Sequence, residues 1–188
     1  MTGAPITLKD AKLSVLRGRA SLHGLVIGNP GDFQSEYAFS VDLIEIEIVP
    51  LSLLSDTILI KSIAVLEPDI NYEMGFKKGV NFKRIQKNID AYLGLEDEEA
   101  TEEESDDGGL RVIIEDLVVH GGKITVSSPM AGGKGAGISL PTFRLQDIGK
   151  EDSGASIQEV VSEFFSALTA SIGKAVKASG NVLSRFFS

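Results

Sequence analysis

The sequence contains no cysteine, which excludes disulfide bonds, thiolate nucleophiles and zinc sites built on cysteine. Its only histidines, His23 and His120, each stand directly before a glycine in a turn-like context, where we expect exposed side chains. No His-x-x-x-His pair is present to chelate a metal, and no Gly-x-Ser-x-Gly motif holds a nucleophilic serine. We therefore expect no catalysis, metal or cofactor. An enzyme whose site forms only in the fold stays open as an alternative.

Long apolar runs and basic stripes are also missing. No uninterrupted run reaches the roughly 20 residues that a membrane-spanning helix needs. Nine of the 27 acidic residues lie between Glu96 and Asp107, and the 18 others equal the 18 basic residues in number. The acidity therefore belongs to a linker, 95–109, which we expect to be flexible because it has little apolar surface to bury. Without a basic surface, we expect no nucleic acid as a partner.

A glycine-rich stretch, 131–137, contains Gly132-Gly133-Lys134-Gly135 and invites comparison with phosphate-binding loops. The glycine spacing of a P-loop is missing, however, and no serine or threonine follows Lys134 to hold a magnesium ion. We interpret this stretch as a connection between two strands.

Short segments of alternating polarity dominate the chain. Residues 41–48 place Ile44, Ile46 and Ile48 on one face of a strand, and Glu45 and Glu47 on the other. Similar patterns predict strands in several further segments: 57–66, 69–73, 110–119, 123–126 and 138–145. The pattern predicts an α+β fold with a twisted and mainly antiparallel sheet, one face of which is apolar.

Glycine and proline predict where these strands are interrupted. In 6–27 we expect breaks at Gly18 and at His23-Gly24, and 32–38 should be loop. The pair Gly121-Gly122 predicts a tight hairpin turn, because glycine adopts the positive φ that such a turn needs. Pro141 cannot donate a hydrogen bond to the sheet, which predicts a bulge or an edge strand there.

Two segments have helical periodicity. The first, about 81–93, begins at Asn81 and places Phe82, Ile85 and Ile89 on one face. The second is a long amphipathic helix within 154–188, for which Ser153 or Ser156 is a candidate cap. The chain thus divides into a sheet segment with a helix (1–94), the linker (95–109), a continuation of the same sheet (110–150) and the terminal helix (154–188).

The apolar face of this terminal helix allows two interpretations. It covers the sheet as part of the core, or it binds a membrane or a partner, with Lys174, Lys177 and Arg185 near an anionic bilayer. The candidate residues are Phe164, Phe165, Leu168, Ile172, Val176, Leu183, Phe186 and Phe187.

Several motifs in 6–148 resemble the AsmA-like family of Gram-negative envelope proteins, which includes TamB. They are turn and strand patterns rather than chemical signatures. The matching segments are 13–33 with Asn29-Pro30-Gly31-Asp32-Phe33, then 52–58, 63–68, Tyr72-Glu73 and Val118-Val119-His120-Gly121-Gly122-Lys123-Ile124.

The resemblance implies a curved sheet in a periplasmic protein associated with the inner membrane, involved in lipid transport or envelope maintenance without catalysis. The anchor of this family would be an amino-terminal helix that this chain lacks. Implied partners are phospholipid or a membrane surface, and envelope proteins.

If the apolar sheet face shelters lipid, each buried methylene contributes about 0.8 kcal/mol. Its candidate residues are Ile44, Ile46, Ile48, Ile58, Ile60, Val112, Ile114, Val118, Ile124 and Val126. Two alternatives stay open. These residues are ordinary core beneath the helices, or the protein is an interaction scaffold that uses a strand edge or the terminal helix.

Overall fold

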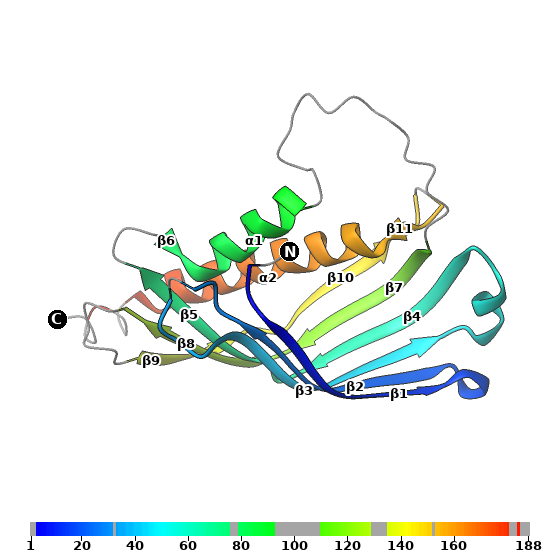
Figure 1. The fold of residues 1–188 in the computed structure, drawn as a ribbon, viewed down its shortest axis with the longest axis horizontal. Coiled ribbons are helices and arrows are strands. Elements are labelled where there is room, and N and C mark those ends of the chain that lie inside the picture. The colour runs from blue at the N-terminus through cyan, green and yellow to red at the C-terminus, as the bar shows by residue number, and fades with distance from the viewer. Residues whose placement is uncertain are drawn as a thin grey trace, which may run out of the picture.

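The fold is an eleven-stranded sheet that curls into a trough, with two helices along its open side, as Figure 1 shows in a computed structural model. The structure describes residues 3–31, 33–75, 79–92, 110–128, 135–151, 153–180 and 184. Its strands are β1 (Ile6–Ser14), β2 (Arg19–Gly28), β3 (Tyr37–Ile48), β4 (Thr57–Leu66), β5 (Asp69–Gly75), β6 (Gly79–Val80), β7 (Arg111–His120), β8 (Gly122–Ser127), β9 (Gly135–Leu140), β10 (Phe143–Ile148) and β11 (Ala155–Ser156). The helices are α1 (Asn81–Tyr92) and α2 (Ile157–Ala178), with 3-10 turns η1 (Val15–Arg17) and η2 (Pro50–Leu54).

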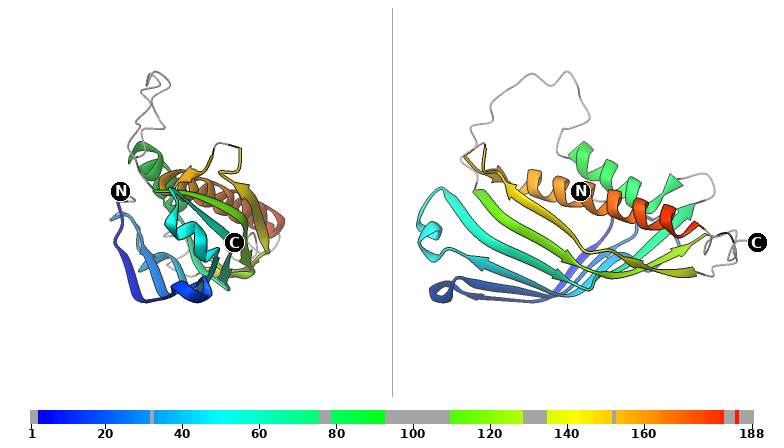
Figure 2. Two further views of the ribbon diagram at one scale, coloured as in Figure 1. Left: turned by 90° about the vertical axis from the view of Figure 1, so that its right-hand side faces the viewer. Right: turned by 180° about the vertical axis from the view of Figure 1, so that it is seen from behind.

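This architecture confirms the predicted α+β fold, the curved sheet and the long carboxy-terminal helix. Viewed end-on in Figure 2, the sheet curls from β1 on one side to β9 and β10 on the other, with the helices between the two rims. Most neighbouring strands are antiparallel, but β4 pairs in parallel with β7 and β5 pairs in parallel with β8. The parallel pairing is possible because the connection between β6 and β7 includes α1, so that β7 can start at the same end of the sheet as β4. The predicted linker at 95–109 lies outside the described residues. So does the predicted connection at 131–137 as far as Lys134, whereas its last three residues, 135–137, belong to β9.

The predicted hairpin at Gly121-Gly122 is wrong. Instead, β8 continues in the direction of β7. β7 pairs with β4 and β8 pairs with β5, and β4 and β5 are separated only by Glu67 and Pro68. The carbonyl of Pro68 accepts a hydrogen bond from the amide of Lys123 at 3.0 Å. A Cβ at Gly122 would lie 2.4 Å from that carbonyl oxygen, so this glycine serves a close approach between neighbouring strands rather than a turn.

The predicted break at His23-Gly24 is also wrong, because β2 continues through it. Gly24 adopts a φ of +63°, and the register is the same on both sides of it: Leu22 pairs with Ile44, and Leu25 pairs with Val41. Pro141 separates β9 from β10 on an edge of the sheet, as predicted. β3 begins at Tyr37, two residues inside the segment predicted as loop.

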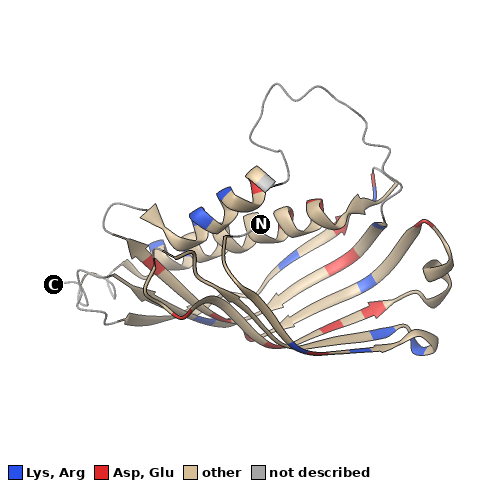
Figure 3. Cartoon of the chain, viewed as in Figure 1, with Lys and Arg blue, Asp and Glu red and all other residues tan. Residues whose placement is uncertain are grey.

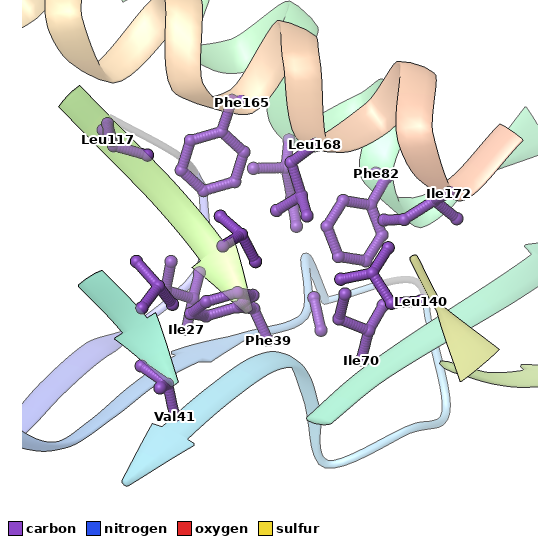
Figure 4. Packing of buried hydrophobic residues seen from close by; sticks show 14 of the residues in the cluster. Ile27, Phe39, Val41, Ile70, Phe82, Leu117, Leu140, Phe165, Leu168 and Ile172 are labelled. Carbon is purple, nitrogen blue, oxygen red and sulfur yellow. The ribbon is translucent and has the colours of Figure 1, made fainter. Parts of the chain in front are cut away.

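Both helices bury the faces that their periodicity predicts. Phe82 and Ile85 of α1 are fully buried, and so are Leu168 and Ile172 of α2. Figure 4 shows the side chains of Phe82, Leu168 and Ile172 pointing toward Phe39, Ile70 and Leu140 of the sheet. Ser156, one of the two candidates, caps α2. Its hydroxyl accepts a hydrogen bond from the amide of Glu159, and the Glu159 carboxylate accepts one from the Ser156 amide at 2.7 Å.

A buried polar cluster fixes the end of β5 to the loop before β3. The Glu73 carboxylate, 3% exposed, accepts hydrogen bonds from the amides of Gln34 and Ser35 and from the Ser35 hydroxyl. Asn81, at the start of α1, accepts from the Glu73 amide and donates to Asn29. The cluster therefore ties together two motifs, 29–33 and Tyr72-Glu73, that lie far apart in the sequence.

Replacing Glu73 with alanine should lower the free energy of unfolding by about 3 kcal/mol, because it leaves buried donors without their charged acceptor. Glu36, an exposed acid in the same loop, provides the control. Glu36→Ala should change stability by less than about 0.5 kcal/mol in the same urea titration. Equal effects of the two substitutions would refute a structural role for Glu73.

The capping box at Ser156 should make stability depend on pH. Hydrogen bonds from the Ser156 amide and hydroxyl lower the pKa of Glu159 below its ordinary value of 4.5. The stabilisation is therefore complete above pH 4.5 and is lost as pH falls below that value. The effect should be small, because the side chain is largely exposed. Glu159→Gln should flatten this part of a thermal unfolding series, and an unchanged slope would contradict the assignment.

Candidate functional site

The inner face of the curled sheet is apolar along β2, β3, β4 and β7, where the strand pairing shows which residues point inward. The rows that cross β2, β3, β4 and β7 pair apolar residues at every inward position: Ala20, Ile46, Ile63 and Leu117 in one row, Leu22, Ile44, Val65 and Val119 in the next. The charged residues of these strands gather on the other face, where Arg19 lies opposite Glu47 and Arg144 forms a 3.1 Å ion pair with Asp116. Figure 3 shows how these charges are spread over the sheet.

Matched irregularities keep the apolar residues on one face. In β4, Ile60 and Ile63 occupy successive inward positions, opposite Ile114 and Leu117 of β7. In β10 the successive inward residues are also three positions apart, at Leu145 and Ile148. Asp147, between them, adopts a φ of +57°. A strict alternation would have turned one half of each strand outward.

The helices cover only part of this inner face. They pack mainly against β5, β6, β9, β10 and β11. Along a single row of paired residues, the exposed fraction falls from 63% at Leu13 of β1 to 3% at Leu117 of β7, with half-buried Ala20, Ile46 and Ile63 between them. Apolar side chains near β1 therefore face solvent, and those near β7 lie in the core.

We call the uncovered part the open inner strip. It comprises the inward residues of β1 to β4 that are exposed or half-buried: Ile6, Leu8, Ala11, Leu13, Ala20, Leu22, Leu25, Ile46, Ile48, Ile58, Ile60 and Ile63.

The apolar stripe of α2 is uncovered at the same end of the molecule. Leu168 and Ile172 are fully buried, whereas Val161 and Ile157, one and two turns before Phe164 on the same stripe, are 38% and 47% exposed. The ring of Phe164 stands edge-on to Phe39 of β3 at a centroid distance of 6.4 Å, where the covered and uncovered parts meet. In Figure 1 the start of α2 lies over the end of the sheet that carries η1 and η2.

The ten candidate residues of the sheet fall into three groups. Ile44, Val112, Ile114, Ile124 and Val126 are buried core. The open inner strip contains Ile46, Ile48, Ile58 and Ile60. Val118 lies on the opposite face, because it pairs with Ala64 and Arg144 while its neighbours Leu117 and Val119 belong to the core.

The candidate residues of the terminal helix also divide. Phe165, Leu168 and Ile172 are buried, and Phe164 and Val176 are half-buried against the core, so the described part of the helix covers the sheet. Leu183, Phe186 and Phe187 lie outside the described residues, and so does Arg185. Sequence periodicity identified Ile46, Ile48, Ile58 and Ile60 of the strip but missed Ile63 of β4 and every strip residue of β1 and β2. In β2, Gly24 with its positive φ interrupts the alternation between Leu22 and Leu25.

The histidines do not assemble a reactive centre with each other. His23 lies on the outer face, where its ring nitrogen is 3.1 Å from the Ser21 hydroxyl, and His120 lies at the end of β7, with β3 and β4 between the two. Within the described residues, no three His, Asp or Glu side chains are placed to hold a metal ion. A hollow of about 570 Å³ beside β1 to β4 is lined by polar residues of the outer face such as Lys12, Arg19 and Glu47, and also by Leu13, Ala20 and Ile46.

Burial raises the pKa of the Tyr72 phenol on β5, which is consistent with an apolar inner face. Among the helices that the structure describes, none has the length and apolar content to cross a membrane.

No protein-family model matches the sequence, and no curated protein matches it. The function is therefore inferred from the geometry and from the resemblance of the motifs in 6–148.

The difference in cover predicts a difference in stability along α2. Leu168→Ala should lower the free energy of unfolding by about 3 kcal/mol, because it opens a cavity in the covered part of the core. Val161→Ala, on the same stripe, should cost less than about 1 kcal/mol, because its side chain is already partly in water. Chemical denaturation of both variants measures the two values, and equal losses would contradict the partial cover of the inner face.

Proposed function

We propose that this protein shelters the acyl chains of a phospholipid on the open inner strip and acts without catalysis. The observation that carries the proposal is the coincidence of two uncovered apolar surfaces. The strip on β1 to β4 and the exposed start of the α2 stripe lie at the same end of the trough. Exposed apolar patches of this kind mark binding surfaces in soluble proteins.

The shape of the strip suits long apolar chains. The ten residues of β2 extend for about 33 Å, and the three spacings from β1 to β4 span roughly 14 Å. Its inward positions are all apolar, so they give van der Waals contact and no hydrogen bonds. Each methylene that leaves water contributes about 0.8 kcal/mol, so even half a chain would bind measurably.

We also propose, from the motif resemblance, that the protein is an AsmA-like component of a Gram-negative envelope. It would act in the periplasm beside the inner membrane. A lipid-sheltering surface fits this setting, because phospholipids must cross an aqueous space between two membranes.

A strand edge favours a second candidate function, an interaction scaffold. All nine residues of β1 are exposed, and among the described strands only β2 pairs with it. An open edge of this length can accept a strand from another protein.

Adjacent residues on β1 allow a matched test of the lipid proposal. Leu8 and Leu13 face inward and are 45% and 63% exposed, whereas Thr7 and Ser14 face outward. The double variant Leu8→Asp, Leu13→Asp should bind a fluorescent acyl-chain probe at least about tenfold more weakly, because a carboxylate would have to leave water. Thr7→Asp, Ser14→Asp should bind it like the unmodified chain.

Native mass spectrometry of the purified protein supplies the second readout. A bound phospholipid in the unmodified chain and in the outward-facing variant, but not in the inward-facing one, is expected. Equal binding by both variants would refute the strip as the site. A bound polypeptide without lipid would support the scaffold instead.

A further inference from the structure

Two neighbouring turns at one end of the trough expose large aliphatic side chains almost completely. Leu16 of η1 is 95% exposed, and Leu51 and Leu54 of η2 are 79% and 88% exposed. We call these three residues, together with the 49% exposed Val15, the leucine tip. Figure 1 shows η1 and η2 beside each other at the end of the sheet where α2 begins.

Hydrogen bonds hold both turns in place, so the exposure is a property of the fold. The Gly18 carbonyl accepts from the amide of Ile48 at 2.7 Å, which joins the two turns. The Ser52 hydroxyl donates to the Val49 carbonyl and accepts from the Leu59 amide, which closes η2. The leucines of the tip are therefore presented to solvent by ordered backbone.

The composition of the tip fits a lipid surface better than a protein. Stable protein interfaces bury at least about 1,000 Å² and rely on aromatic and arginine anchors, whereas four aliphatic side chains on two turns offer a small area without an aromatic ring. Arg17, in η1, is the one charged residue of η1 and η2. Its long side chain can reach a phosphate group while the leucines enter the acyl layer.

We propose that the leucine tip inserts into one leaflet of a phospholipid bilayer. Leu13 of the open inner strip lies two residues before Val15, so a bilayer at the tip would meet the end of the strip directly. The inference concerns docking alone and holds whether or not the strip takes up lipid.

The absence of tryptophan from the chain allows a direct test. Leu16→Trp and Leu54→Trp each place a single fluorophore at the tip, and Lys83→Trp places one on the exposed side of α1 as the control. With vesicles of phosphatidylethanolamine and phosphatidylglycerol, emission from the two tip variants should shift to shorter wavelength and be quenched by lipids brominated in the acyl chain. The control should change in neither respect.

A second pair of variants separates docking from lipid uptake. Leu16→Ser, Leu54→Ser should weaken co-sedimentation with the same vesicles at least about tenfold, and Leu8→Asp, Leu13→Asp should leave most of it. Because the tip side chains are exposed, neither tip change should lower the melting temperature. An unshifted tip fluorophore, equal quenching at Lys83→Trp, or tip variants that alter the oligomeric mass without vesicles would overturn the proposal.

Discussion

The structure depends on one geometric constraint: the apolar inner face of the sheet is wider than the two helices that cover it. Burial of apolar surface is the main stabilising term in folding, and here Phe82, Leu168 and Ile172 supply it over one part of the face. Towards β1 the same rows of side chains continue without a partner. The molecule is therefore held together by one part of its inner face, while another part remains open to solvent.

The outer face presents the charged residues of these strands to solvent. Charged residues such as Arg19, Glu45 and Glu47 lie there, and their opposite signs on neighbouring strands stabilise the pairing modestly. Sheet edges are a known risk for aggregation, and Lys9 and Lys12 on β1 are the kind of charged residue that limits it. The charges of these strands thus lie on the face opposite the open inner strip, a separation that a surface sheltering lipid in water would need.

The spacing of apolar residues along the sequence predicted those helices and strands in which contacts with other elements do not interrupt the regular spacing. The alternation in β3 and the three- and four-residue spacing in α1 and α2 identify the right structure and the right buried face, because each reflects a single repeat. The sequence offered Ser156 as one of two candidate caps, and the structure selects it through a capping box with Glu159.

Features that depend on distant strands were not predictable in this way. Gly121-Gly122 has the composition of a hairpin turn, but its conformation is set by the approach of Pro68 from a neighbouring strand. Val118 reads as part of the apolar face until the step between Ile114 and Leu117 turns it outward. The partial cover by α2, which defines the open inner strip, is a property of tertiary packing and has no local signal.

The central claim is that apolar ligands contact the open inner strip and not the covered core. Methyl NMR of the intact chain with a spin-labelled fatty acid measures this directly, because the label broadens only nearby signals. The account predicts strong broadening at Leu13, Leu22 and Ile46, and little at Leu168 and Ile172. Broadening centred on the outer face around Val26 and Leu43, or none at all, would contradict it.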